Sequence, residues 1–133
     1  MSKIINVDIK QFSYNQKTIL ENISFSVDKG EFIVITGLSG CGKTSLLRLL
    51  NGLIPTLYEG NMTGEINILD RSISDYKAGE IAKYVGNVFQ NPNDQFFSKD
   101  VENEVALIGE NMGMERCMLH TQVENAIKET GIE

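Results

Sequence analysis

Residues 37–44 constrain the fold of this 133-residue chain more than any other stretch, because they read Gly-Leu-Ser-Gly-Cys-Gly-Lys-Thr. They match the pattern of a glycine, four free positions, then Gly-Lys followed by Ser or Thr, which is the pattern of a phosphate-binding P-loop. Glycines at 37, 40 and 42 let successive backbone N–H groups turn toward one anion without Cβ clashes. The pattern therefore predicts a strand, this loop and a helix, with phosphate held at the positive end of the helix.

The segments on either side of the loop fit this order. Residues 31–36 contain the uninterrupted apolar run Phe32-Ile33-Val34-Ile35, which is typical of a strand buried on both faces at the centre of a sheet. After the loop, leucines at 46, 47, 49, 50 and 53 have helical spacing, and the helix is expected to end near Gly52 or Pro55.

The polar residues of the loop indicate the ligand. Lys43 is placed to reach the β- and γ-phosphates, and the Thr44 hydroxyl is placed to bind Mg²⁺. A nucleoside triphosphate with magnesium is therefore the implied ligand.

The rest of the sequence predicts strands over residues 4–9, 19–27, 64–70 and 84–89, and two helices. One helix is expected to be capped by Asp100, with Glu102 and Glu104 in its first turn, and the other to span residues 115–130.

Composition excludes several other classes of protein. The chain has 12 Lys and Arg against 18 Asp and Glu, a net charge of −6, and its basic residues are scattered, which argues against a general nucleic-acid binder. The longest apolar run is far too short to span a bilayer, and the first residues lack the apolar centre of a secretory signal, so a cytosolic chain is expected. Cys41 and Cys117 are expected to be free thiols, and the length favours one domain.

Two common classes of P-loop protein fit poorly. No Asn-Lys-x-Asp sequence follows Lys43, so the guanine-reading loop of a small GTPase is absent from the sequence. A nucleotide kinase would carry several arginines in a lid, whereas only Arg71 and Arg116 follow Arg48.

The P-loop and two other parts of the chain together resemble the ATP-binding subunits of ABC transporters. Tyr14 lies 23 positions before Gly37, where that family has an aromatic residue that stacks on adenine, with Phe12 as the competing candidate. Phe89-Gln90-Asn91-Pro92 is similar to the family's Q-loop, in which Gln90 would contact Mg²⁺ and the attacking water. The resemblance implies ATP and Mg²⁺ as cofactors, with Thr44 and Gln90 at the metal. The implied nucleotide-binding residues are Tyr14, Gly37, Leu38, Ser39, Gly40, Cys41, Gly42, Lys43, Thr44 and Ser45.

Further segments resemble one group of that family, the energy-coupling-factor importers for vitamins and for cobalt or nickel. The similar segments are residues 51–55, 58–65 and 91–97. This resemblance implies a second ATP-binding subunit, a transmembrane T component and a peripheral location on the cytoplasmic face of the membrane. Phe96 and Phe97 would lie where the family contacts the T component, although a buried aromatic pair is an equal alternative.

Several motifs of a complete ABC ATPase do not occur in the sequence. It has no Leu-Ser-Gly-Gly-Gln signature, no Walker B aspartate followed by glutamate, and no switch histidine. Asp70 is followed by Arg71 rather than by an acid, and His120, in an expected helix, is interpreted as a surface residue. The expected fold is α/β, a truncated P-loop NTPase core with an antiparallel β subdomain and the start of a helical subdomain, so that residues 1–133 form the amino-terminal part of an ABC-type domain.

Two interpretations of the function remain open. In the first, the chain is part of an ATP-hydrolysing subunit that energises a membrane importer. In the second, it is a nucleotide-binding or interaction remnant without turnover. Because hydrolysis requires a group that orients or deprotonates water, no catalytic residue is predicted and these residues alone are expected to be inactive.

Overall fold

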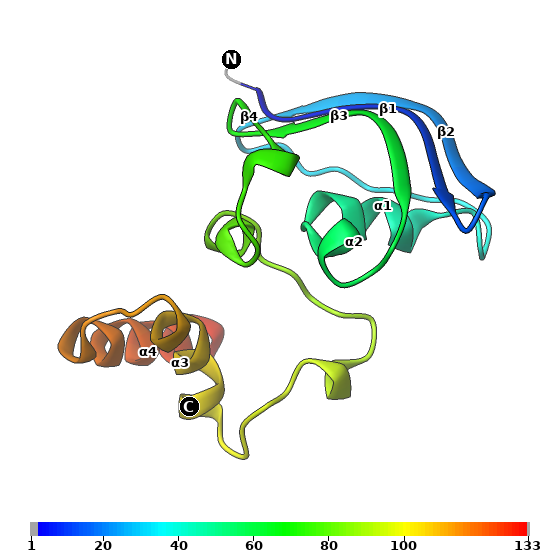
Figure 1. Cartoon of the computed structure of the whole chain (residues 1–133). Coiled ribbons are helices and arrows are strands. Elements are labelled where there is room, and N and C mark those ends of the chain that lie inside the picture. Colours follow the sequence, from blue (N-terminus) through cyan, green and yellow to red (C-terminus); the bar gives the residue numbers. More distant parts are fainter. Residues whose placement is uncertain (1–2, 133) are drawn as a thin grey trace. The chain divides into compact units, whose positions relative to one another are not determined.

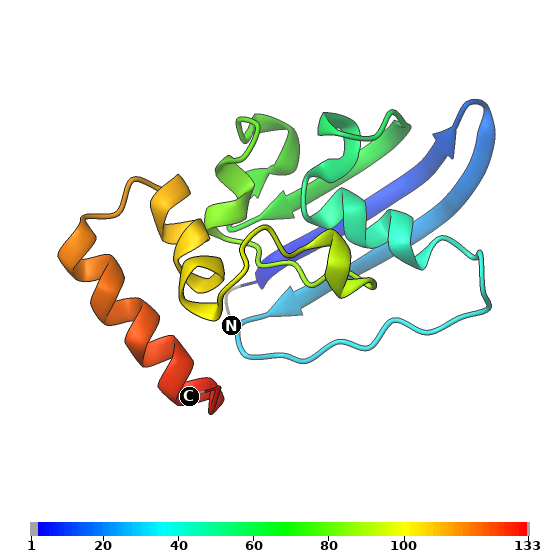
Figure 2. The same ribbon diagram turned by 90° about the horizontal axis from the view of Figure 1, so that it is seen from below.

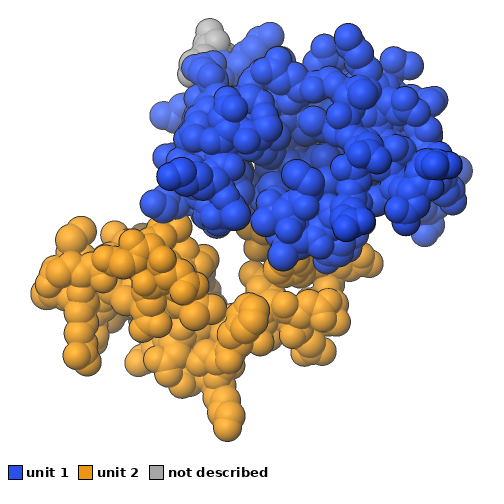
Figure 3. All heavy atoms as spheres, in the orientation of Figure 1, with its two compact units in different colours: residues 1–86 blue, residues 87–133 orange. Residues whose placement is uncertain are grey.

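The computed structural model describes residues 3–132 and divides into two compact units, within residues 1–86 and 87–133 (Figure 3). The sequence favours one domain, whereas the chain folds around two separate groups of contacts. The P-loop lies in the first unit, and the Q-loop-like segment lies in the second.

The first unit is built on a four-stranded sheet with the order β2-β1-β3-β4 (Figure 1). Its strands are β1 (Lys3–Tyr14), β2 (Lys17–Asp28), β3 (Asn61–Ile68) and β4 (Arg71–Ser72). All neighbouring pairs are antiparallel. The strands expected over residues 4–9 and 19–27 are therefore confirmed. The strand expected over residues 64–70 also exists, but it begins at Asn61 and ends at Ile68. The antiparallel β part of the predicted fold is confirmed.

A β-bulge explains why the alternation of apolar residues in β1 looks imperfect. Val7 and Ile9 are fully buried, and so is Phe12, although Phe12 is three positions after Ile9 rather than two. The register against β3 shifts between Ile9 and Gln11, so Lys10 is an extra residue that moves the inward face from odd to even positions. Opposite Ile9, Gly64 has φ +117°, and a Cβ there would overlap the carbonyl oxygen of Asp8.

Two helices cover the inner face of the sheet (Figure 1). Helix α1 (Lys43–Leu50) contributes Leu46 and Leu49 to the core, and α2 (Leu53–Thr56) contributes Ile54. The predicted helix thus exists, and it ends two residues before Gly52, whose φ of +73° turns the chain between α1 and α2. A Cβ at Gly52 would lie 2.9 Å from Cγ2 of Ile81, another core residue. Gly52 is therefore needed both for the turn and for packing.

The strand predicted over residues 31–36 is wrong. These residues have no regular secondary structure, and within the described chain the N–H groups of 32–36 donate no backbone hydrogen bond (Figure 2). The exposed fractions of their side chains are 90% for Phe32, 48% for Ile33, 67% for Val34 and 36% for Ile35. A run that is apolar on both faces suits a strand between two parallel neighbours. The described residues form antiparallel pairs only, so this segment has no such neighbour.

The strand predicted over residues 84–89 is also not formed. The N–H groups of Tyr84 and Val85 both donate to the carbonyl of Ile81, which closes the short helix η2 (Glu80–Lys83) instead. Val88 and Phe89 are exposed. As with residues 31–36, the apolar pattern indicates a strand whose neighbours the described residues do not supply.

An ion pair connects η2 to the edge of the sheet. Nη1 of Arg71 in β4 lies 2.8 Å from Oε1 of Glu80, and Oε2 of Glu80 accepts the N–H of Lys77 at 2.9 Å. The Lys77 N–H and the Arg71 guanidinium together lower the pKa of the Glu80 carboxyl. This pair therefore joins the two ends of the segment that contains η1 (Ile73–Asp75).

The second unit contains η3 (Pro92–Asp94), α3 (Val101–Asn111) and α4 (Arg116–Thr130). Asp100 caps α3 as predicted, because its Oδ1 accepts the N–H of Asn103 at 2.9 Å. Both predicted helices are therefore confirmed. They approach closely at Gly109, where a Cβ would overlap the side chain of Leu119. Within residues 3–132, no helix is both long enough and apolar enough to cross a bilayer.

Candidate functional site

The loop at residues 37–42 leads directly into α1. Its one internal backbone hydrogen bond joins the N–H of Cys41 to the carbonyl of Leu38 at 3.2 Å, and the first bond of the helix joins Leu46 N–H to the Gly42 carbonyl at 2.9 Å. Gly40 and Gly42 have φ values of +80° and +99°. Both values lie in the left-handed region that glycine adopts without strain, so these two glycines determine the path of the loop.

Gly42 is also packed tightly against the sheet. A Cβ at this position would lie 2.7 Å from Cδ2 of Leu20 and 3.0 Å from Cγ2 of Ile19, both in β2. Leu20 is in turn paired with Phe12 in β1. The loop is therefore held against the part of the β1–β2 hairpin where Phe12 lies.

The beginning of α1 presents hydrogen-bond donors that the protein does not use. In the described chain, the N–H groups of Lys43, Thr44 and Ser45 have no acceptor, and Gly42 supplies no side-chain cap. The first turn of α1 also carries no acidic residue. Free N–H groups at the positive end of a helix form a site for an anion, and phosphate is the usual one.

The Lys43 side chain folds back along the loop. Its Nζ donates to the carbonyls of Gly37 and Leu38, both at 2.8 Å, and lies 3.6 Å from Sγ of Cys41. The Cys41 sulfur would be 2.7 Å from a Cβ on Gly37, so the two arms of the loop lie close together. The ammonium group therefore adds a full positive charge to the loop that leads into α1.

The other predicted loop residues differ in their exposure. Thr44 is exposed, so its hydroxyl is accessible to a metal ion, whereas Ser45 is buried beside Leu46. Other exposed residues of the loop are Leu38, Ser39, Gly40 and Cys41.

Cys41 and Cys117 are free thiols, as predicted. In the described residues no group of three or more His, Cys, Asp or Glu side chains is arranged to hold a metal ion.

The two aromatic candidates for adenine stacking have different environments. Phe12 is completely buried in the core, so its ring cannot meet a ligand without unfolding the sheet. Tyr14 is half-buried and packs edge-on against Phe12, with ring centroids 4.8 Å apart and planes at 83°. The Tyr14 hydroxyl is buried without a hydrogen-bond partner among the described residues. Of the two rings, only Tyr14 has surface that is open to a ligand.

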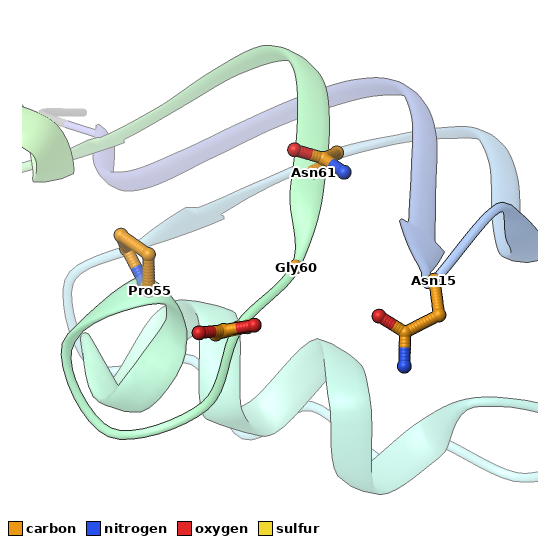
Figure 4. Close-up of a pocket in the computed structure, with 5 residues that line it drawn as sticks. Asn15, Pro55, Gly60 and Asn61 are labelled. Atoms are coloured by element: carbon orange, nitrogen blue, oxygen red, sulfur yellow. The ribbon is translucent and has the colours of Figure 1, made fainter.

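A pocket of about 310 Å³ opens at the same end of the sheet (Figure 4). It is lined by residues that follow β1, precede or begin β3, or belong to α2, namely Asn15, Pro55, Glu59, Gly60 and Asn61. Asn15 directly follows Tyr14. The pocket therefore adjoins the residue that the sequence places at the adenine.

Gln90 lies in the second unit, where it is exposed and has no regular secondary structure. Gln95, which no sequence motif singles out, organises this segment. Its Oε1 accepts the Phe89 N–H at 3.2 Å and its Nε2 donates to the Asn87 carbonyl at 3.3 Å. A glutamine five residues after another one matches no motif, so the sequence contains no signal for Gln95.

Phe96 and Phe97 are both exposed, which contradicts the alternative of a buried aromatic pair.

The positions of Asp70 and His120 agree with their interpretation from sequence. Leu69 and Asp70, with φ values of +51° and +60°, form the tight turn between β3 and β4. Asp70 thus lies in an antiparallel hairpin, not at the end of a buried parallel strand. His120 is exposed on α4, with Nδ1 3.5 Å from Oε1 of Glu124.

The loop, the helix that follows it and the antiparallel sheet define the class as that of P-loop NTPases, here represented by part of the domain. The family model described as ABC transporter matches residues 20–133. The chain therefore belongs to the ABC transporter family.

Similar proteins agree with this assignment. The chain is 38% identical over 132 residues to an ABC transporter ATP-binding protein of Treponema denticola, covering 98% of the chain and 27% of that protein. It is 41% identical over 133 residues to one of Methanosarcina mazei, covering 98% and 23%. It is 35% identical over 132 residues to the energy-coupling factor transporter ATP-binding protein EcfA of Pediococcus pentosaceus, covering 96% and 45%. The chain thus spans about a quarter of the first two relatives and less than half of the third.

Proposed function

We propose that this chain binds Mg²⁺-ATP through the loop at residues 37–45 and supplies the ATP-binding part of an importer of the energy-coupling-factor type. The observation that carries the proposal is the free N–H groups of Lys43, Thr44 and Ser45 beside the Lys43 ammonium. Such an array matches the several negative oxygens of a triphosphate.

Each loop residue has a separate role in this proposal. The backbone of residues 37–42 surrounds the phosphates, and the ammonium of Lys43 exchanges its weak hydrogen bond to the Cys41 sulfur for a phosphate oxygen while it keeps its two bonds to carbonyls. Thr44 and Gln90 are the proposed magnesium ligands, and the ring of Tyr14 is the proposed surface for adenine. Bound Mg²⁺ would neutralise charge on the phosphates.

The importer type rests on a narrower observation. EcfA of Pediococcus pentosaceus, whose name includes the energy-coupling factor, aligns with nearly the whole chain. By this proposal the partners are a transmembrane T component and a second ATP-binding subunit, and the chain lies at the cytoplasmic face of the membrane. The exposed Phe96 and Phe97 are available for contact with the T component.

The alternative function is nucleotide binding without hydrolysis, and the position of Asp70 favours it for these 133 residues. A carboxylate that activates water must lie near the phosphates, yet Asp70 lies in the β3–β4 turn and is followed by Arg71. We propose that residues 1–133 form the P-loop part of an ABC-type ATP-binding domain, and that hydrolysis requires groups beyond those present here.

Isothermal titration calorimetry with Mg²⁺-ATP tests the proposal directly. We expect saturable binding of one nucleotide per chain and much weaker binding of Mg²⁺-AMP, because AMP lacks the β- and γ-phosphates that Lys43 would contact. Equal binding of ATP and AMP would contradict the phosphate assignment, and no saturable heat with ATP would contradict the function.

Tyr14→Ala is expected to weaken ATP binding by about tenfold or more, because stacking of one base on an aromatic ring is worth roughly 1–3 kcal/mol. The matched control is Tyr14→Phe, which keeps the ring and removes only a buried hydroxyl that has no partner. Phe12→Ala should instead cost about 3–5 kcal/mol of stability, since Phe12 is a core residue. Calorimetry and thermal denaturation of the three variants separate these effects. Unchanged affinity in Tyr14→Ala would remove Tyr14 from the site.

A further inference from the structure

A second cavity of the first unit has a volume of about 610 Å³ and is lined by residues of α1, α2, β3, η1 and η2, and by none of the described P-loop residues. We call it the η1–η2 cavity. Its inner surface is apolar, because Leu49, Ile54 and Ile81 belong to the hydrophobic core. The residues that it shares with the smaller pocket of Figure 4 are Pro55, Gly60 and Asn61. Volumes of roughly 300–1,000 Å³ are typical of pockets that bind small molecules.

The η1–η2 cavity carries a single formal charge. Among the described residues that line it, Lys77 is the only one whose side chain is charged at neutral pH. The whole chain has 18 Asp and Glu residues and a net charge of −6, yet no described acidic residue lines this cavity. Hydroxyl groups come from Thr56, Thr63 and Ser74. An apolar surface with one cation and several hydroxyls is complementary to an apolar molecule that has one anionic group.

The backbone of Lys77 is held in place, whereas its ammonium group is free. The Lys77 N–H donates to Oε2 of Glu80 at 2.9 Å, and Oε1 of Glu80 lies 2.8 Å from Nη1 of Arg71. In the described chain the Lys77 ammonium makes neither a hydrogen bond nor an ion pair. A cation on a fixed backbone loses less freedom when it binds an anion, so this arrangement lowers the entropic cost of binding.

Tyr76, another lining residue, is also fixed. Its hydroxyl donates to the Ile68 carbonyl at 2.7 Å, and Cζ of Arg71 lies 4.3 Å from the centroid of its ring. Arg71 thus contacts Tyr76 and also pairs with Glu80, on the two sides of Lys77 in the sequence. The part of the wall around Lys77 is therefore formed before any ligand arrives, as in most pockets for small molecules.

We propose that the η1–η2 cavity binds a small organic carboxylate with an apolar body, whose carboxylate lies at the Lys77 ammonium. The pair forms a charge-assisted hydrogen bond. Burial of the apolar body supplies most of the affinity, because Lys77 is exposed and an exposed ion pair contributes little. The volume of about 610 Å³ suits one small molecule taken from solution.

This inference does not require that the chain binds ATP, and the two proposals can fail separately. The carboxylate is titrated with no nucleotide present. Failure of the carboxylate to bind would leave the free N–H groups of α1 available to phosphate, and failure of Mg²⁺-ATP to bind would leave the η1–η2 cavity unchanged.

Octanoate is the probe, and NMR titration of the whole chain measures its binding. We expect saturable shifts of the amides of residues 73–81. The affinity should rise about fourfold for each methylene group added between hexanoate and octanoate, because each one is buried against the apolar surface. Octylammonium has the same chain and the opposite charge, and we expect it to bind at least about fivefold more weakly.

Lys77→Gln should weaken the binding of octanoate about fivefold and leave that of 1-octanol unchanged, because it removes the ion pair and keeps the apolar contacts. Lys77→Glu should reverse the preference, so that octylammonium binds more tightly than octanoate. Lys83→Gln is the matched control, since it removes an exposed lysine of η2 that does not line the cavity. It should bind octanoate as the wild-type protein does.

The proposal is overturned if octanoate and octylammonium bind the wild-type protein equally, or if the shifted amides lie away from the cavity. Equal weakening of octanoate binding by Lys77→Gln and Lys83→Gln would contradict it as well. Binding of the chain to vesicles of phosphatidylglycerol, with no binding of free octanoate, would also overturn it, because the ligand would then be a membrane surface.

Discussion

Lys43→Ala is expected to abolish the rise in melting temperature that Mg²⁺-ATP gives to the wild-type protein. The substitution removes the ammonium group that two hydrogen bonds hold against the loop carbonyls. At a nucleotide concentration 100 times the dissociation constant, binding adds about 2.7 kcal/mol to the free energy of unfolding. For a unit of this size that corresponds to a rise on the order of 10 °C.

Thermal denaturation with and without Mg²⁺-ATP measures this effect, and the baseline of each variant without nucleotide removes any change in intrinsic stability. Lys29→Ala is the control, because it changes the net charge by the same amount at an exposed residue outside the loop. We expect the control to keep nearly the whole rise. A rise of equal size in the two variants would show that ATP binds elsewhere.

Gly64→Ala is expected to destabilise the first unit by about 3 kcal/mol or more, which is the largest effect on the fold that we predict for a single methyl group. Gly64 has a φ of +117°, and its Cβ would overlap the Asp8 carbonyl oxygen and lie 2.9 Å from the Lys10 nitrogen. Those atoms belong to the backbone of β1 and cannot move without breaking the bulge. Backbone strain of this kind costs about 1–3 kcal/mol, and the overlap adds to that cost.

Gly30→Ala separates the two contributions. Gly30 also has a positive φ, +86°, but no atom lies within 4 Å of its Cβ position. The Gly30→Ala variant should therefore lose only about 1–2 kcal/mol of stability, which is the cost of placing a residue with a side chain in a left-handed conformation. Urea denaturation followed by far-ultraviolet circular dichroism compares the two variants. Equal losses of stability would mean that the contact between β3 and β1 at the bulge is not tight.

Local signals in the sequence were sufficient for most of the elements. The alternation in β2 and β3, the leucine spacing of α1 and the Asp100 cap depend on residues a few positions apart, and each was found where predicted. The glycine spacing likewise located the loop. These features depend on neighbours that the segment itself provides.

The failures have the opposite cause. The apolar run from Phe32 to Ile35 suits a strand that lies between two other strands. The pattern within the run does not show whether the fold provides those neighbouring strands. The bulge at Lys10 was hidden for a related reason, because it moves Phe12 to the inner face only when β3 is present as the partner. Gly64 within an apparent strand was the one available signal for it.

The backbone of the candidate site could be predicted from the sequence, whereas its contacts with the rest of the fold could not. The loop and the N-terminus of α1 follow from the glycines and Lys43, whereas the contact of Gly42 with Ile19 and Leu20 depends on the fold of the hairpin. Spacing favours Tyr14 over Phe12, and the register of β1 adds what spacing does not show, because it buries Phe12 completely and leaves Tyr14 half-buried. The stacking of adenine on Tyr14 stays a prediction.

The double restriction on Gly42 has a consequence for the genetics of this protein. A substitution there would meet both an unfavourable φ of +99° and the side chains of Ile19 and Leu20. A suppressor that shortens Leu20 would relieve the steric overlap and leave the backbone strain unchanged. We therefore expect selections for revertants of Gly42 variants to return glycine at position 42 itself rather than a second-site suppressor.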